Sequence, residues 1–201
     1  MKFPIFASFL VFCAFVTFIT KKSSKQGMQT KEEFFEKERQ ANATRRQPLD
    51  NLDYITIPLT SLPLACCKDD EKIKEYIEII STLSQNKIVN LTGITNTDLK
   101  LKYGAPNIDL LMNFDQNFTV LVRTLHLWGR RLEELKEKEA AIKVLEFGVQ
   151  CQSDVSGNYQ ILGSIYKEQG KDYKIQELLE TAKSLNSMTK NSIVRYLENL
   201  L

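Results

Sequence analysis

The segment NYQILGSIYKEQGK, residues 158–171, decides the fold because it places a glycine inside an amphipathic helix. Large apolar side chains recur in it at helical spacing, as at Tyr159 and Tyr166. Gly163 lies in the middle of this helix, where glycine costs about 1 kcal/mol relative to alanine, and Gly170 ends it. A glycine at such a position is typical of a helix whose backbone closely approaches another element.

The same pattern occurs 34 residues earlier, where Gly129 corresponds to Gly163. Further pairs at this interval are Leu132 and Tyr166, Ala141 and Ile175, Leu145 and Leu179, Gly148 and Ala182, and Ser153 and Ser187. A period of this length with helical apolar spacing predicts stacked helix pairs. We place the two repeats at 122–155 and 156–189.

This pattern resembles the tetratricopeptide repeat (TPR), in which W-x2-L-G-x2-Y begins a pair of antiparallel helices. Tyr159 stands where that family has tryptophan, and Ser153 and Ser187 stand where it has proline. The resemblance implies an all-α fold, a short TPR-like solenoid of antiparallel helix pairs, with residues 190–201 as its capping C-terminal helix. A generic helical bundle is the alternative.

Residues 66–201 are expected to form the helical domain that contains these repeats. Sequence signals before the repeats predict a helix over 69–85 with Asp69 or Asp70 as N-cap, a short helix capped by Thr95 or Thr97 and ended by Gly104, a long helix over 114–138, and its antiparallel partner over 139–151.

Residues 3–20, FPIFASFLVFCAFVTFIT, contain no charge and are long enough to span a bilayer as a helix. No small-residue cleavage site precedes Lys21, so we expect an uncleaved transmembrane anchor over 1–20 rather than a signal peptide, the main alternative. The lysines at 21, 22 and 25 outnumber the single Lys2 before the segment. This bias favours a single-pass protein of the cell membrane with a cytoplasmic C-terminal domain.

Residues 21–65 are expected to join the anchor to the domain as a juxtamembrane helix and an extended, proline-containing linker. A capping box, TKEE, begins the helix at Thr30. This helix is either a solvated spacer or lies against lipid headgroups through Phe34 and Phe35. The linker at 47–63 has three prolines and a β-branched YITIP run. Its apolar residues are expected to dock on the helical domain, and a strand that binds a partner is the alternative.

Composition excludes several classes of function. The net charge is only +2, which gives no indication of nucleic-acid binding. The basic excess lies in residues 21–48, with eight Lys or Arg against four Asp or Glu, beside the apolar segment, where an anionic membrane surface would attract it. The four cysteines include no C-x-x-C pair and no histidine cluster, so we expect no metal site and no cofactor.

Catalysis is not expected. His126 is the only histidine in the chain, and none of the common phosphate-binding, metalloprotease or serine-hydrolase motifs occurs. Paired acids such as Glu133 and Glu134 are typical of a solvated helix face. Binding is therefore the favoured class of function.

The TPR resemblance implies that the first helix of each repeat lines a concave groove. Arg123, His126 and Arg130 then form one stripe, at helical spacing i, i+3 and i+7. Gln160, Ser164 and Lys167 are the corresponding residues of the second repeat. A basic stripe suits an acidic peptide or a C-terminal carboxylate, although an ordinary solvated face is the alternative. The asparagines of the family's carboxylate clamp are absent.

These observations predict a membrane-anchored scaffold or adaptor that binds a protein or peptide partner through a TPR-like domain. The layout also resembles bacterial membrane-tethered repeat proteins, which implies no particular activity. The alternative is an obligate structural subunit of a membrane complex, in which the groove would be filled permanently.

Overall fold

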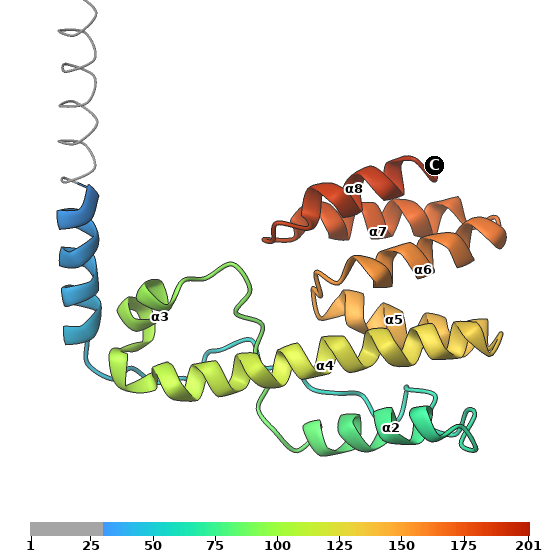
Figure 1. The fold of residues 1–201 in the computed structure, drawn as a ribbon, viewed down its shortest axis with the longest axis horizontal. Helices are drawn as coiled ribbons and strands as arrows, with labels where there is room; N and C mark the ends of the chain where they lie inside the picture. Colours follow the sequence, from blue (N-terminus) through green and yellow to red (C-terminus); the bar gives the residue numbers. More distant parts are fainter. Residues whose placement is uncertain (1–29) are drawn as a thin grey trace, which may run out of the picture. The chain divides into compact units, whose positions relative to one another are not determined.

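The computed structural model describes residues 30–201, and nearly all of its regular structure is helical (Figure 1). The only β pairing in this range is an isolated antiparallel bridge between Tyr54 and Val89. The all-α prediction is therefore confirmed for the described residues. Within them, no helix combines the length and the apolar character needed to cross a membrane. The expected anchor lies outside this range.

The described chain forms two compact units, the first made of residues 30–47 and 95–108. It contains a helical segment over 30–43, α3 (Asn96–Tyr103) and the 3-10 turn η1 (Ala105–Asn107). Thr95 caps α3 by accepting a hydrogen bond from the Asp98 amide, as expected. Ion pairs join the two helices, from Lys37 to Asp98 at 2.8 Å and from Lys100 to Glu38 at 3.3 Å.

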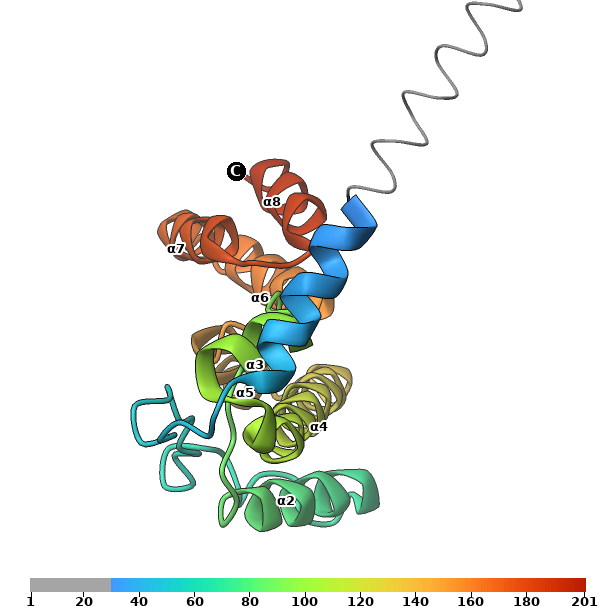
Figure 2. The ribbon, with the colours of Figure 1, turned by 90° about the vertical axis from the view of Figure 1, so that its left-hand side faces the viewer.

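The second unit comprises residues 48–94 and 109–201 and contains the predicted repeats. Its helices are α2 (Glu71–Leu83), α4 (Ile108–Glu134, all but its first residue), α5 (Lys138–Gln150), α6 (Ser156–Glu168), α7 (Asp172–Ser184) and α8 (Lys190–Glu198). Figure 1 shows α4 to α8 stacked in chain order, with α2 on the other side of α4. In Figure 2, α5 and α7 lie on the left of this stack and α4 and α8 on the right.

The backbone repeats at the interval found in the sequence. Helices α5 and α7 begin and end 34 residues apart, as do the C-terminal ends of α4 and α6. Both of those ends close in the same way, with a left-handed residue, Lys136 (φ 67°) or Gly170 (φ 66°). The amide that follows each one donates back to the helix, from Glu137 to Leu132 and from Lys171 to Tyr166. These are Schellman motifs, which satisfy carbonyls at a helix end.

The predicted bounds of the long helix, 114–138, were wrong at both ends, because it spans Ile108–Glu134. It starts six residues earlier since the 3-10 turn η1, which contains Pro106, leads directly into it. It stops earlier because Lys136 takes the left-handed conformation, which sequence reading assigns to glycine. The other helices lie close to their predicted positions, and Asp70 caps α2.

The linker docks on the helical unit, as its apolar residues predicted. Ile57 and Leu62 are buried in the same core cluster as Trp128 of α4. Next to the bridge of Tyr54, the Ile55 amide donates to the Ile88 carbonyl at 2.9 Å. Residues 48–62 are therefore held on the core through Ile57 and Leu62, with turns at 50–51 and 59–61, and the single bridge of Tyr54 does not make the segment part of a sheet.

The two corresponding glycines serve close packing, but against different neighbours. A Cβ atom added at Gly129 would fall within 3.0 Å of the Leu145 side chain of α5. A Cβ atom added at Gly163 would lie 3.3 Å from the side chain of Leu197, in α8, and 2.7 Å from that of Leu200, just after α8. Gly129 therefore allows the two helices of the first pair to approach, whereas Gly163 allows the closing helix to dock on α6.

Candidate functional site

Two of the three predicted groove residues of the second repeat, Gln160 and Ser164, line a surface hollow of about 360 Å³, and Lys167 does not. The hollow is bordered by α6, α8, the last turn of α4 and the first residue of α5. Its lining residues are Glu133, Lys138, Gln160, Ile161, Ser164, Ile165, Glu168 and Tyr196. Of the six predicted site residues, Gln160 and Ser164 are therefore brought together here.

Tyr196 of α8 fixes one wall of the hollow. Its hydroxyl lies 3.0 Å from the Ser164 hydroxyl and donates to the Gln160 carbonyl at 3.2 Å. Gln160 and Ser164 lie one turn apart on the exposed face of α6. The closing helix thus occupies part of the face that was expected to be an open groove, and the remaining hollow is correspondingly short.

His126 is not a free cation on this surface. Its Nδ1 lies 3.0 Å from Oδ1 of Asn158, a fully buried residue of α6. A Cβ atom at Gly157 would fall within 3.0 Å of the imidazole Cε1, so the ring rests on the α6 backbone. Burial lowers the pKa of His126 below its ordinary 6.5. The hydrogen bond with Asn158 opposes this shift, and the nearby charge of Arg130 adds to it. His126 therefore joins α4 to α6 as a neutral ring near pH 7.

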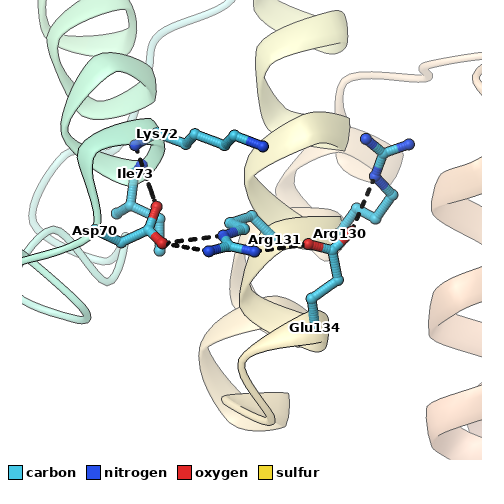
Figure 3. A network of polar contacts seen from close by, with 6 residues as sticks. All are labelled: Asp70, Lys72, Ile73, Arg130, Arg131 and Glu134. Carbon is cyan, nitrogen blue, oxygen red and sulfur yellow. Dashed lines mark hydrogen bonds and ion pairs between the residues drawn. The ribbon is translucent and has the colours of Figure 1, made fainter.

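Arg130 lies in a network of polar contacts rather than alone (Figure 3). Its Nε is 3.7 Å from Oε1 of Glu134, and Oε2 of the same carboxylate is 3.0 Å from Arg131. Arg131 in turn donates to Asp70 at 2.6 Å and 3.0 Å. Part of the Arg130 charge is therefore compensated on its own helix.

The two remaining predicted cations differ in their surroundings. Arg123 is exposed and has no ion-pair partner among residues 30–201. Lys167 pairs with Asp172 across the α6–α7 turn at 3.3 Å. Of the predicted basic residues, Arg123 alone keeps an uncompensated charge within the described chain.

Sequence reading missed three polar residues of the hollow. Lys138 and Glu168 form an ion pair across its rim, and Tyr196 forms its wall. Glu133, which also lines the hollow, was expected on a solvated helix face. The missed residues lie on a helix start, a helix end and the capping helix, which the repeat pattern of first helices does not assign to a groove. The hollow is consequently of mixed charge, with two carboxylates and one amine.

A cluster of two cysteines and a glutamate lies near the α4–α5 turn. The Sγ atoms of Cys66 and Cys67 are 3.5 Å apart, and the ligand atoms of both thiols and of Glu137 lie within 4.8 Å of one another. Burial, the hydrogen bond with Cys67 and the Glu137 carboxylate raise the pKa of Cys66 to about 11. Sequence reading did not bring these three side chains together, because Glu137 is distant in sequence from the two cysteines.

Comparison with known proteins identifies no relative. Neither family models, nor curated proteins, nor solved structures match this chain.

Proposed function

We propose that the chain is a membrane-anchored adaptor whose TPR-like helical domain binds a protein partner without catalysing a reaction. The observation that carries the proposal is the hollow at α6 and α8, which lies on a stack with a 34-residue backbone period. Stacked helix pairs of this kind present extended binding surfaces between repeats. An anchor at residues 3–20 would hold this surface at the membrane and raise the effective concentration of partners there.

The lining of the hollow favours an adaptor over the alternative, an obligate structural subunit. Interfaces that are buried permanently resemble a protein core and are strongly apolar. The hollow instead carries Glu133 and the ion pair between Lys138 and Glu168. Such a polar surface is stable in water when no partner is bound, as an exchangeable interaction requires.

The partner segment is proposed to combine hydrogen-bonding groups with at least one acidic residue. Ser164 and Tyr196 offer hydroxyl groups within the hollow. Arg123, exposed on α4, offers a charge for an acidic residue. Because the hollow holds two carboxylates, a uniformly acidic segment is disfavoured, and the preference for acid depends on Arg123.

Photo-crosslinking in the native membrane tests this proposal. A crosslinking amino acid replaces Gln160, which is exposed in the hollow, in the full chain. The matched control carries it at Tyr173, which is 58% exposed on α7. The proposal requires a discrete protein adduct from position 160 and a much weaker one from position 173. Equal adducts from both positions, or none from position 160, would contradict it.

Depletion of the crosslinked partner then separates the adaptor from the obligate subunit. An adaptor leaves a fraction of chains without adduct, and depletion of the crosslinked partner leaves the chain at its normal level. An obligate subunit becomes unstable and is degraded when its partner is depleted.

A further inference from the structure

Two segments distant in sequence bring three metal-ligating side chains together. Cys66 and Cys67 come from the turn before α2, and Glu137 precedes α5. The sulfur atoms are 3.5 Å apart, and all three ligand atoms lie within 4.8 Å of one another. Among residues 30–201, this is the one group of at least three cysteine, histidine or acidic side chains with such spacing.

The spacing suits a single thiophilic ion. Zinc binds thiolate sulfur at about 2.3 Å in a tetrahedral arrangement, which places two bound sulfurs about 3.8 Å apart. The observed separation of 3.5 Å differs from that value by a small side-chain rotation. The Glu137 carboxylate supplies a third ligand of a type that zinc also accepts, and a fourth position remains for water.

The fold holds the two cysteines in place before any ion binds. Cys67 has a left-handed backbone (φ 51°), and the amide of Cys66 donates to the Pro63 carbonyl at 3.0 Å. The Asp70 amide donates to the Cys67 carbonyl, and the Asp70 carboxylate is bonded to Arg131 of α4. A binding site whose ligands are already positioned loses less entropy when it binds.

The cluster is also open to an incoming ion. Both thiols are half-buried and Glu137 is exposed, so solvent reaches one side of the group. Partial burial strengthens the attraction between ligands and ion, and the exposed carboxylate provides a path of entry.

We propose that Cys66, Cys67 and Glu137 form a binding site for a thiophilic divalent metal ion of the zinc and cadmium class. On binding, each thiol releases one proton to solvent and the carboxylate enters as an anion. The two thiolates, the carboxylate and the ion then have a net charge of −1. The bound ion connects the turn before α2 to the α4–α5 turn. The proposal is independent of the adaptor function.

Metal titration of the full chain in detergent, with a non-thiol reductant present, tests the site. Zn²⁺ is titrated against a chromophoric chelator, and Cd²⁺ is followed by its ultraviolet sulfur-to-metal charge-transfer band. We expect one equivalent of either ion per chain. Cys66→Ser and Cys67→Ser should each weaken binding at least about tenfold, as loss of even a supporting group does at metal sites.

Matched variants locate the site. Glu137→Gln should weaken affinity but retain the cadmium band, because both thiolates remain. Cys151→Ser removes a buried thiol outside the cluster, and Cys13→Ser removes the cysteine of the N-terminal apolar segment. Neither substitution should change metal binding. Circular dichroism verifies that each variant stays helical.

Three results would overturn the proposal. The first is that neither ion binds at one equivalent. The second is that the Cys66→Ser and Cys67→Ser double variant binds as tightly as the parent. The third is an affinity unchanged by Glu137→Gln, which decides the matter even if the cysteine variants fail to fold, since Glu137 is exposed.

Discussion

The two oxygens of the Asp70 carboxylate bind two different helices (Figure 3). Oδ1 accepts hydrogen bonds from the amides of Lys72 and Ile73 and so caps α2. Oδ2 accepts two from the Arg131 guanidinium of α4. One side chain therefore both begins α2 and fixes it against the repeat stack.

Replacing Asp70 should separate these two roles. Asp70→Asn keeps a capping oxygen but loses the charge that faces Arg131, whereas Asp70→Ala loses both. We expect the melting temperature to fall from the parent to Asp70→Asn and further to Asp70→Ala. Circular dichroism on the full chain measures it. An alanine variant as stable as the parent would contradict the dual role.

The parent and Asp70→Asn should also differ in their response to acid. Hydrogen bonds from Arg131 hold the pKa of Asp70 below its ordinary 3.8. The stabilisation from this group is therefore fully present above pH 3.8 and is lost as pH falls through the lower pKa of the folded state. The stability difference between the two proteins should shrink in that acid range, and a constant difference would exclude the ion pair as its source.

His126 should titrate below pH 6.5, since burial disfavours its charged form. Because the folded pKa is depressed, the neutral ring contributes stability that is present above 6.5 and falls as pH drops through the folded pKa. His126 is the only histidine, so its proton resonance needs no assignment by mutation. Asn158→Asp, which places a carboxylate beside the ring, should raise the midpoint. A parent midpoint above 6.5 would restore His126 as a groove cation.

Gly163→Leu should destabilise the domain by about 1–3 kcal/mol by overpacking, because its side chain would collide with Leu197 and Leu200. Gly129→Leu should have a similar effect through Leu145. Chemical denaturation measures both. Gln176→Leu, at an exposed α7 position, is the control and should change stability by less than about 0.5 kcal/mol. A Gly163 variant no less stable than this control would refute close docking of α8.

Charge reversal on α4 should abolish partner crosslinking from position 160 without unfolding the domain. Arg123→Glu with Arg130→Glu replaces two exposed cations, and such changes usually alter stability by about 0.5 kcal/mol or less. Most of the loss should come from Arg123, because Arg130 is already paired with Glu134. Lys143→Glu, exposed on α5, is the control for a single charge reversal outside this stripe. If the double variant retains its adduct, binding does not depend on this stripe.

A cysteine at position 188 should report the expected topology. Met188 is fully exposed, between α7 and α8, so Met188→Cys offers an accessible thiol without disturbing the core. With the domain in the cytoplasm, an impermeant thiol reagent should label this residue only after the cells are permeabilised. Labelling of intact cells, above the level of the parent chain, would reverse the orientation.

Sequence alone determined the helical period, several helix starts and the closing helix. Asp70 and Thr95 were identifiable because a cap depends on residues within one turn of the chain. The correspondence of Gly129 with Gly163 predicted the repeat, since both lie at the same point of an amphipathic pattern. These signals are local, and residues close in sequence are sufficient to produce them.

Tertiary structure decided where the charged side chains of the hollow and the metal-ligating side chains of the cysteine cluster lie. Lys136 takes the left-handed conformation although it is not a glycine, so sequence reading placed the end of α4 too far along the chain. His126 contacts Asn158 on another helix, so an expected cation is instead a partly buried hydrogen-bonding group. Glu137 meets the Cys66 thiol across seventy residues of chain. Such contacts depend on how helices pack together, and packing is set by the whole core rather than by any one stretch of sequence.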